Sequence, residues 1–227
     1  MSADDQKRRA GEAAAELAQD GMVLGLGTGS TAAWFVKALA ARRLSVRCVC
    51  TSKATEALAA SLGLPLLDLN DAPPIDLTVD GADQIGPGLA LIKGGGAALL
   101  REKLVWEASL RCVAIADAAK PAPHLGAFPL PIEVVAFGHL TTRRRIEAVL
   151  QACAIGAEPV LRLKDGAPLA TDGGNLIYDV ACGVIPDPAA LAAALDRVTG
   201  VVEHGLFLNL ADLALVGQDD GVTQLTP

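Results

Sequence analysis

Four charged side chains in the first half of the sequence are of the types that proton transfer next to a carbonyl requires. Asp80 and Asp83 lie three residues apart, Lys93 precedes three consecutive glycines, and Glu102 follows nine residues after that lysine. A carboxylate base together with a cation that stabilises an enediolate is what abstraction of a weakly acidic α-proton needs. Each residue alone has an ordinary alternative, with Asp80 as a loop cap and Glu102 as a solvated residue favoured by a helix dipole.

Two glycine-rich segments have the composition of anion-binding loops. Gly25-Leu-Gly-Thr-Gly-Ser-Thr31 is expected between a strand and a helix, where backbone N–H groups hold phosphates. It departs from the dinucleotide fingerprint because Ser30 stands at the sixth place and no acidic residue ends the next strand. Thr51-Ser-Lys at that place suits a 2′-phosphate, so an NADP-dependent oxidoreductase stays open as an alternative, as does a plain strand-to-helix turn. Lys93-Gly-Gly-Gly is not a Walker loop, because its lysine precedes the glycines, and it predicts an electropositive corner.

Alternating strands and helices are predicted to position these residues. Hydrophobic spacing and capping residues predict helices at 4–17, 32–39, 51–62 and 97–109, and strands at 22–26, 46–49, 65–69, 75–79 and 112–116. The strands are apolar on both faces, which is typical of a mostly parallel sheet covered on both sides. We therefore expect a Rossmann-like α/β domain whose strands end at the candidate residues, where ligands bind in open sheets.

The pattern changes after Lys120. A strand at 132–135, a helix capped by Thr141 or Thr142, alternating strands at 160–163 and 175–180, and a helix capped by Asp187 are predicted. This order is close to a ferredoxin-like split βαβ unit, a small α+β domain expected over 127–201. The catalytic α/β domain would comprise 1–126 and 202–227, with the apolar stretch 205–216 returning to its sheet as an edge strand.

The composition excludes several classes of protein. A chain of 227 residues suits one large domain, or one ordinary domain with a small companion. Its 52% hydrophobic and 20% charged residues supply a real core, which argues against disorder. The net charge of −7 argues against nucleic acid or a membrane surface as the main partner. The longest stretch without charged residues, Gly21 to Val36, is broken by glycines and shorter than the about 20 residues of a spanning helix.

Cysteine and histidine usage predicts neither disulfides nor a metal site. The five cysteines are scattered and odd in number, without a C-x-x-C pair, so buried thiols in a reducing compartment are expected. The three histidines show no ligand spacing and are expected at the surface or partly buried. The first residues carry acids before bases and no apolar signal segment, so we expect a cytoplasmic protein.

Taken together and in order, the motifs resemble those of type A ribose-5-phosphate isomerases. The resemblance extends from about Lys7 to Gly221. It rests on Gly27-Thr-Gly-Ser-Thr, Thr51-Ser-x-x-Thr55, Asp80-Gly-Ala-Asp83, Lys93-Gly-Gly-Gly-Ala-Ala, Arg101-Glu-Lys103, Phe128-Pro-Leu-Pro, Gly174-Asn-x-Ile-x-Asp179 and Gly205-Leu-Phe. Several independent motifs in one order make this resemblance far more specific than a single glycine loop.

The resemblance implies reversible conversion of D-ribose 5-phosphate to D-ribulose 5-phosphate in the non-oxidative pentose phosphate pathway, without metal or organic cofactor. Glu102 would move a proton between C2 and C1 through a cis-enediolate that Lys93 stabilises. Asp80 would assist opening of the sugar ring, and Asp83 would bind hydroxyls. Substrate binding would use Gly27, Thr28, Gly29, Ser30, Thr31, Gly81, Ala82, the backbone N–H groups of Gly94, Gly95 and Gly96, Lys120 and Lys7. The partner would be a small sugar phosphate, and the protein a homo-oligomer, dimer or tetramer.

One residue departs from the pattern, since Gln84 stands where the family usually has glutamate after Asp83. We hypothesise that this residue only orients its neighbours, which an amide can still do. The alternative from a different class is a sensing module on the same fold that binds phosphosugars without turnover. Glu102 and Lys93 together favour the enzyme, and no basic DNA-binding segment is present to serve such a sensor.

Overall fold

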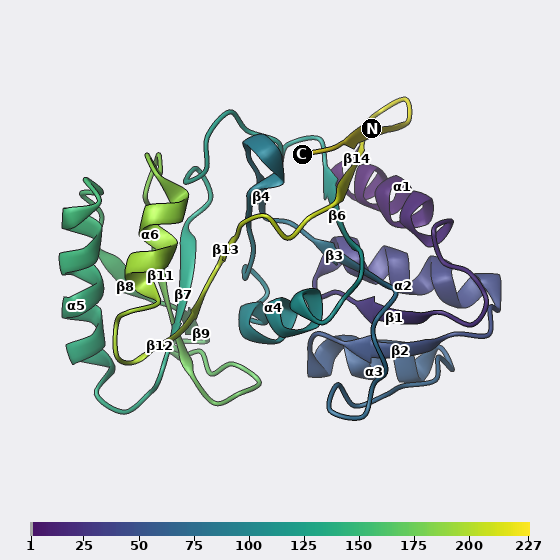
Figure 1. Ribbon diagram of the computed structural model, residues 1–227, viewed down its shortest axis with the longest axis horizontal. Coiled ribbons are helices and arrows are strands. Elements are labelled where there is room, and N and C mark those ends of the chain that lie inside the picture. The colour runs from purple at the N-terminus through teal and green to yellow at the C-terminus, as the bar shows by residue number, and fades with distance from the viewer. Residues whose placement is uncertain (1) are drawn as a thin grey trace. The chain divides into compact units, whose positions relative to one another are not determined.

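The computed structural model describes residues 2–227 and divides them into two compact units (Figure 1). The first unit comprises the chain up to Ala82, Arg101–Pro121 and Asn209–Pro227, and the second comprises Asp83–Leu100 and Ala122–Leu208. These boundaries differ from the expected ones, because β4 (Gln84–Ile85), β5 (Leu91–Ile92) and β13 (Leu206–Phe207) pair in one three-stranded sheet of the second unit. Strands of two residues leave no periodicity in a sequence. The 3₁₀ turn η1 (Pro87–Leu89) joins β4 to β5.

The first unit contains the expected Rossmann-like sheet. Its strand order is β15-β14-β6-β3-β1-β2. The bounds are β1 (Val23–Leu26), β2 (Arg47–Cys50), β3 (Leu77–Gly81), β6 (Cys112–Asp117), β14 (Leu213–Gly217) and β15 (Val222–Leu225). All neighbours pair in parallel except β14 and β15. The predicted return of the stretch 205–216 to this sheet is confirmed by β14, but its place at the edge was wrong, because β15 turns back and pairs outside β14.

Helices cover both faces of this sheet, as predicted. α1 (Ala3–Ala15), α2 (Ser30–Arg42) and α3 (Lys53–Ser61) share one apolar core cluster with the sheet, in which Phe35 and Leu39 pack with Leu24 and Val113. On the other face, Val105 of α4 (Leu99–Glu107) joins a cluster with Val23 and Val49 of the sheet and with Ile75, which precedes β3. The buried strands are therefore held so that their carboxyl ends stay at a fixed edge.

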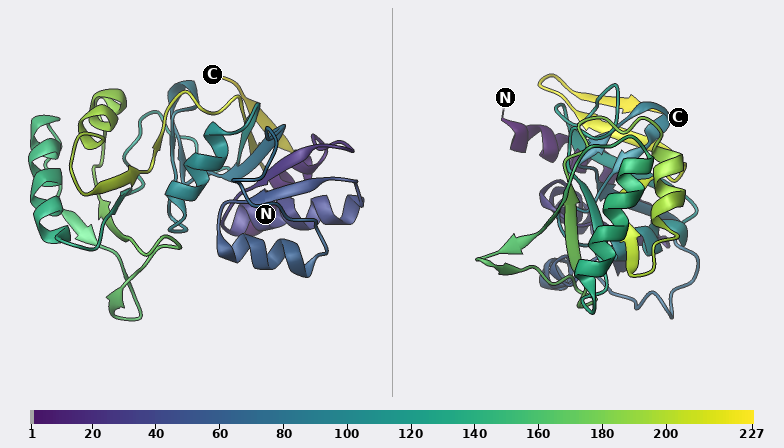
Figure 2. Two further views of the ribbon diagram at one scale, coloured as in Figure 1. Left: turned by 60° about the horizontal axis from the view of Figure 1, so that its bottom comes forward. Right: turned by 90° about the vertical axis from the view of Figure 1, so that its left-hand side faces the viewer.

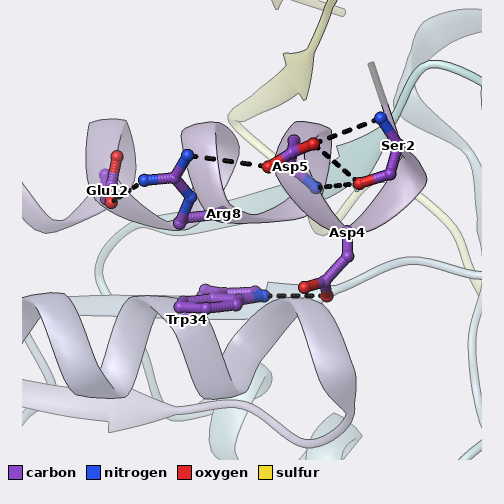
Figure 3. A network of polar contacts seen from close by, with 6 residues as sticks. All are labelled: Ser2, Asp4, Asp5, Arg8, Glu12 and Trp34. Carbon is purple, nitrogen blue, oxygen red and sulfur yellow. Dashed lines mark hydrogen bonds and ion pairs between the residues drawn. The ribbon is translucent and has the colours of Figure 1, made fainter.

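Polar contacts attach the start of α1 to α2 (Figure 3). Ser2 caps α1 by accepting a hydrogen bond from the Asp5 N–H at 3.2 Å, while the Asp5 carboxylate accepts one from the Ser2 N–H at 3.2 Å. The Trp34 indole of α2 donates to the Asp4 carboxylate at 3.1 Å. Such reciprocal caps stabilise helix starts by about 1 kcal/mol. They also fix the turn of α1 that carries Lys7.

The second unit contains the predicted ferredoxin-like arrangement, with a fourth strand at the sheet edge that the sequence pattern did not predict. Its four-stranded antiparallel sheet has the order β12-β7-β11-β8, from β7 (Leu130–Val134), β8 (Pro159–Leu161), β11 (Leu176–Val180) and β12 (Val201–His204). α5 (His139–Ala152) follows β7 and α6 (Pro188–Leu195) follows β11, and the two helices lie side by side (Figure 2). Their apolar faces pack on Ile132, Val134 and Val180. A small hairpin pairs β9 (Leu163–Lys164) with β10 (Ala167–Pro168).

Two local predictions were wrong. The strand expected at 65–69 is reduced to a single parallel bridge between Leu66 and Cys48, because Pro65 has no N–H and the Asp68 side chain turns the chain by accepting from the Asn70 N–H at 2.8 Å. α5 begins after Gly138, in the left-handed region, rather than at a threonine cap. Within residues 2–227, no helix is long and apolar enough to cross a membrane.

Candidate active site

Three segments of the first unit that hold candidate residues lie at the carboxyl edge of its parallel strands, while Lys7 stands in α1 and Glu102 in α4. The loop Gly27–Thr31 follows β1, Asp80 is the penultimate residue of β3, and Lys120 comes shortly after β6. Because β1, β3 and β6 run parallel, these three segments meet at one edge of the sheet. This is the edge at which open α/β sheets bind ligands.

Asp80 holds the glycine loop directly. Its Oδ1 accepts hydrogen bonds from the Thr28 N–H at 2.9 Å and from the Gly81 N–H at 2.7 Å, and its side chain is buried. No residue other than glycine fits at position 27, since a Cβ there would lie 2.4 Å from the Asp80 Cα. The loop-cap interpretation of Asp80 is therefore correct for Oδ1, and it is compatible with a chemical role for the same carboxylate.

Three hydroxyl groups fix Thr28 from the other side. The Thr28 Oγ1 lies 2.7 Å from the Thr51 Oγ1, 2.8 Å from the Ser52 Oγ and 3.3 Å from the Thr55 Oγ1. Thr51, Ser52 and Thr55 are buried. Their hydroxyls thus hold the glycine loop, which argues against Thr51 and Ser52 as ligands of a cofactor 2′-phosphate. The motif in which they occur was recognised from the sequence, but this supporting role was not.

The glycine loop borders a small cavity whose other lining residues are mostly apolar: Ala33, Val36, Ala54, Thr55 and Leu58. The cavity measures about 250 Å³ and lies beside the loop residues Gly27, Thr28, Gly29 and Ser30. Gly29, with φ +104°, is the N-cap of α2, and no acidic residue stands in the first turn of that helix. The Lys7 ammonium donates to the Ser30 Oγ at 3.1 Å. A helix N-terminus with a lysine beside it is the arrangement that stabilises a phosphate.

Glu102 stands in the first turn of α4 with only 3% of its surface exposed. The alternative of a solvated surface glutamate was therefore wrong. Carboxylates are rarely buried to this degree in proteins unless they are paired with another group or serve a catalytic or binding function. Its neighbour Lys103 is also buried, whereas Arg101 is half-buried.

The second unit holds Asp83, Lys93 and the three glycines. The Gly95 N–H donates to the Asp83 Oδ2 at 2.7 Å, which connects the carboxylate to the glycine loop. The Lys93 side chain is 1% exposed, and its ammonium lies 5.3 Å from the centroid of the Phe207 ring, within the range of a cation–π contact. The Lys93 N–H donates to the Gly205 carbonyl at 2.9 Å. β13 therefore positions the lysine, which explains the late Gly205-Leu-Phe motif.

The predicted residues fall into two groups. The first unit holds Lys7, Gly27–Thr31, Asp80–Ala82, Glu102 and Lys120, and the second holds Asp83 and Lys93–Gly96. Within the first unit the structure brings Asp80 to the glycine loop and Lys7 to Ser30, and within the second it brings Asp83 to Gly95.

His204 is buried, contrary to the expectation that the histidines lie at the surface or are only partly buried. It lies with Asp196 and Glu203 in a cluster whose oxygen and nitrogen atoms are within 4.8 Å of one another. The His204 Nε2 is 3.2 Å from the Asp196 Oδ1, and its Nδ1 accepts from the Leu206 N–H at 3.3 Å. Both ring nitrogens thus bind protein atoms, and the histidine supports β13.

Three of the cysteines have raised thiol pKa values, which makes them poor nucleophiles at neutral pH. Burial raises the pKa of Cys48 to about 12 and, with Glu56 nearby, that of Cys50 to about 12. Burial also raises the pKa of Cys182 to about 11. None of the five cysteines forms a disulfide with another described residue. Cys48 and Cys112 are buried, as the sequence predicted for all five, whereas Cys50, Cys153 and Cys182 are only partly buried.

Comparison with known proteins identifies relatives over the whole chain. A family model described as ribose 5-phosphate isomerase A (phosphoriboisomerase A) matches residues 47–221. The chain is 68% identical over 228 residues to ribose-5-phosphate isomerase A of Caulobacter vibrioides, covering 100% of both chains. It is 54% identical over 227 residues to the protein of that name from Methylorubrum extorquens, covering 98% of this chain and 96% of the relative.

Solved structures agree with these relatives. Ribose 5-phosphate isomerase A from Neisseria gonorrhoeae superimposes with a TM-score of 0.92 at 35% identity, over 100% of this chain and 98% of that chain. A D-ribose-5-phosphate isomerase in complex with phospho-erythronic acid superimposes with a TM-score of 0.92 at 34% identity, over 100% of both chains. Sequence and fold agree with these relatives over the whole chain, and the chain belongs to the ribose 5-phosphate isomerase A family.

Proposed function

We propose that this protein interconverts D-ribose 5-phosphate and D-ribulose 5-phosphate by proton transfer between C2 and C1, as an aldose–ketose isomerase of the non-oxidative pentose phosphate pathway. The reaction is proposed to use no metal and no organic cofactor. Membership of the family supports ribose 5-phosphate as the substrate. A solved relative in complex with phospho-erythronic acid supports a sugar phosphate as the class of ligand.

The phosphate end of the substrate is assigned to the loop Gly27–Thr31. The N-terminus of α2 offers backbone N–H groups and a partial positive charge, and Lys7 adds a full one near Ser30. Lys120 supplies a second cation at the same sheet edge. Gly81 and Ala82 continue the strand that carries Asp80 and are assigned to the same substrate. Binding a phosphate remote from the reacting carbons supplies energy that holds those carbons in position.

The proton transfer is assigned to Glu102 as the base. Abstraction from C2 of the open-chain aldose gives a cis-enediolate, and the proton returned to C1 gives the ketose. Lys93 and N–H groups of the Gly94–Gly96 loop stabilise the enediolate oxygens as negative charge develops. Asp80 assists opening of the furanose ring, and Asp83 binds hydroxyls.

The burial of Glu102 is the observation that carries this proposal. A glutamate at 3% exposure in the first turn of a helix is shielded from water, which strengthens its interaction with a bound substrate. Lys93 is buried to a similar degree. Burying the Glu102 carboxylate and the Lys93 ammonium opposes folding unless their contacts compensate. Their burial therefore favours a catalytic role for both residues over the role of ordinary surface charges.

The test is conversion of ribose 5-phosphate by the wild type and by Glu102→Gln, with EDTA present and no nucleotide added. We expect rapid turnover by the wild type and a loss of about a thousandfold or more in kcat for the variant, because a general base contributes about 10²- to 10⁴-fold. Lys93→Met in the Glu102→Gln background should cost less than it does alone, because residues acting on one transition state are not additive.

The sensing alternative makes a different prediction in the same assay. A wild type that binds ribose 5-phosphate in calorimetry but does not convert it would contradict the isomerase and favour a non-catalytic sensor. Glu107→Gln is a suitable control for the Glu102 variant, since Glu107 is an exposed carboxylate at the other end of α4.

We also propose that the protein is a cytoplasmic homo-oligomer, a dimer or a tetramer. Five free cysteines, two of them buried and three partly buried, support a reducing compartment. Sedimentation equilibrium of the purified chain tests the assembly: a monomer at micromolar concentration would contradict it.

A further inference from the structure

The motif Gly174-Asn-x-Ile-x-Asp179 has no part in the proposed chemistry, yet its polar side chains are committed to partners on one face of the β7–β11–β8 sheet. Asn175 donates to the Glu133 Oε1 at 3.0 Å. Asp179 accepts two hydrogen bonds from Arg162, one of them from Nε to Oδ2 at 2.8 Å, in a fork-to-fork pair. Arg162 follows β8 directly, and its backbone N–H donates to Ile177 of β11 at 2.8 Å.

The remaining nitrogen of the Arg162 guanidinium reaches the glycine loop. Its Nη1 donates to the Gly94 carbonyl at 2.8 Å and to the Gly95 carbonyl at 3.3 Å. The Arg162 side chain is only 14% exposed; its hydrogen bond to the Gly94 carbonyl is partly buried, and the one to the Gly95 carbonyl is exposed. Arg162 thus joins the sheet to the loop that carries Lys93.

The same loop is held at its other side by Asp83. The Gly94–Gly95 peptide has its carbonyl bonded to Arg162 and its N–H bonded to the Asp83 Oδ2 at 2.7 Å. The Ala97 N–H also donates to the Gly94 carbonyl, at 3.0 Å, and closes the turn. Gly94 adopts a φ of +104°, and a Cβ there would lie 3.0 Å from the Leu99 Cβ and 3.2 Å from the Pro131 Cγ. The orientation of this peptide is therefore determined at both ends.

The next peptide joins Gly95 to Gly96. Of the contacts described above, the hydrogen bond from Arg162 to the Gly95 carbonyl is the one that orients it. In a trans peptide the N–H points opposite to the carbonyl, so a guanidinium that holds the Gly95 carbonyl directs the Gly96 N–H to the opposite side of the loop. The Gly95 N–H is already donated to Asp83. Gly96 is accordingly the N–H donor whose direction Arg162 sets.

We propose that Arg162, held by Asp179, is a positioning residue for the isomerase reaction: it sets the direction of the Gly96 N–H toward the enediolate and, through Gly95, the position of the Asp83 carboxylate. This proposal rests on the proposed function. An arginine suits the role because its planar fork satisfies a carboxylate with two donors and leaves a third for the loop carbonyls. A lysine at 162 keeps the charge but cannot make both sets of contacts.

The experiment compares Arg162→Lys, Arg162→Ala and Asp179→Asn with the wild type, and uses Arg143→Lys as the matched control. Arg143 is another arginine of the second unit, whose Nε lies 2.9 Å from the Glu147 Oε1 within α5. We expect kcat to fall by about 10- to 100-fold in both Arg162 variants, as is typical when a supporting hydrogen bond is removed, and by a smaller factor in Asp179→Asn. KM for ribose 5-phosphate should change less than threefold, about the scale of a weak contact.

Three further readouts separate positioning from a loss of folding. Guanidinium ion at millimolar concentration should restore part of kcat in Arg162→Ala and none in Glu102→Gln. Affinity for phospho-erythronic acid, measured by calorimetry, should fall by about the factor by which kcat/KM falls, because the ligand's carboxylate stands in for enediolate oxygens. Circular dichroism should match the wild type for Arg162→Lys.

The experiment distinguishes failure of the positioning role of Arg162 from failure of the proposed isomerase activity. If the wild type isomerises ribose 5-phosphate and Arg162→Lys retains kcat within twofold, the positioning role is wrong and the isomerase stands. A uniform loss of stability and kcat without rescue by guanidinium would equally contradict the role. If the wild type does not turn over, the proposed function fails, and the positioning role fails with it.

Discussion

The side-chain amide of Gln84 donates a hydrogen bond to the His124 carbonyl at 2.7 Å. Its Oε1 accepts from the Gly126 N–H at 3.0 Å and the Phe128 N–H at 3.1 Å, and the side chain is 3% exposed. The partners fix which end of the amide is oxygen, because two N–H donors need an acceptor and the carbonyl needs a donor. Gln84 thus organises the loop 124–128, which supports the hypothesis that it orients its neighbours.

The Gln84→Glu variant should be less stable at neutral pH. A carboxylate accepts from the two N–H groups but cannot donate to the His124 carbonyl, so a buried repulsion of about 1–3 kcal/mol is expected. Burial favours the protonated acid, which can donate, so the loss should shrink as pH falls from 7 to 5. Urea unfolding at both pH values measures it.

For activity, we expect the kcat/KM of Gln84→Glu to stay within about tenfold of the wild type, a difference of about 1.4 kcal/mol. A rise of more than tenfold would contradict the orienting role and assign the residue to tuning charge. Gln84→Met, which lacks both hydrogen-bonding ends, should lose stability at both pH values and provides the control.

Gly27→Ala should abolish the close packing of the loop on β3. The new Cβ would meet the Asp80 side chain at 2.2 Å and its backbone Cα at 2.4 Å, so the strand and not only a side chain has to move. We expect kcat/KM to fall by about a hundredfold, since a shift of about 1 Å in positioned groups has this effect. Gly156→Ala has nothing within 4 Å of the added Cβ and should behave as the wild type in the same assay.

Lys7→Met should weaken phosphate binding without slowing the chemical step. With the ammonium near Ser30 removed, KM for ribose 5-phosphate should rise about tenfold and kcat change little, as expected for binding energy shared by ground and transition states. Ribose without its phosphate distinguishes the cause, because kcat/KM for that substrate should be unchanged. Lys164→Met, at an exposed lysine of β9, is the control, and an equal effect there would contradict the assignment.

The thiols of Cys48 and Cys50 should resist alkylation in the folded protein. With pKa values of about 12 for Cys48 and Cys50, the thiolate at pH 8 is about a thousandfold scarcer than at the ordinary pKa of 9.0. Iodoacetamide followed by peptide mass spectrometry should label both residues slowly in buffer and rapidly in urea. Rapid labelling in buffer would show that the pKa is not raised.

The same shift predicts alkaline destabilisation. A thiol whose folded pKa is raised contributes stability that is present below about pH 9, the unfolded value, and is lost as pH rises through about 12. The urea midpoint should therefore fall between pH 8 and pH 11, and fall less in a variant with Cys48 and Cys50 both replaced by alanine. Equal slopes in the two proteins would be evidence against this linkage.

The sequence by itself determined the alternation of strands and helices, the two kinds of domain, and the residues that could do chemistry. These follow from local signals: buried strands are apolar, helix starts need caps such as Asp187, and three consecutive glycines are retained only where bare backbone is needed. The Asp80–Asp83 and Lys93–Gly96 motifs were visible for the same reason. The site residues named from them remain a prediction until the variants are measured.

The tertiary structure alone decided which of these groups are buried and what holds them. Glu102 gives no sign in the sequence that it is 3% exposed, and Arg162 gives none that it bonds Gly94, 68 residues away. The boundary between the units differs from the predicted one because of β4, β5 and β13. Each of these strands has two residues, too few to show a hydrophobic periodicity. Burial and long-range hydrogen bonds depend on how distant segments fold together, and a single sequence specifies that only through the whole set of its contacts.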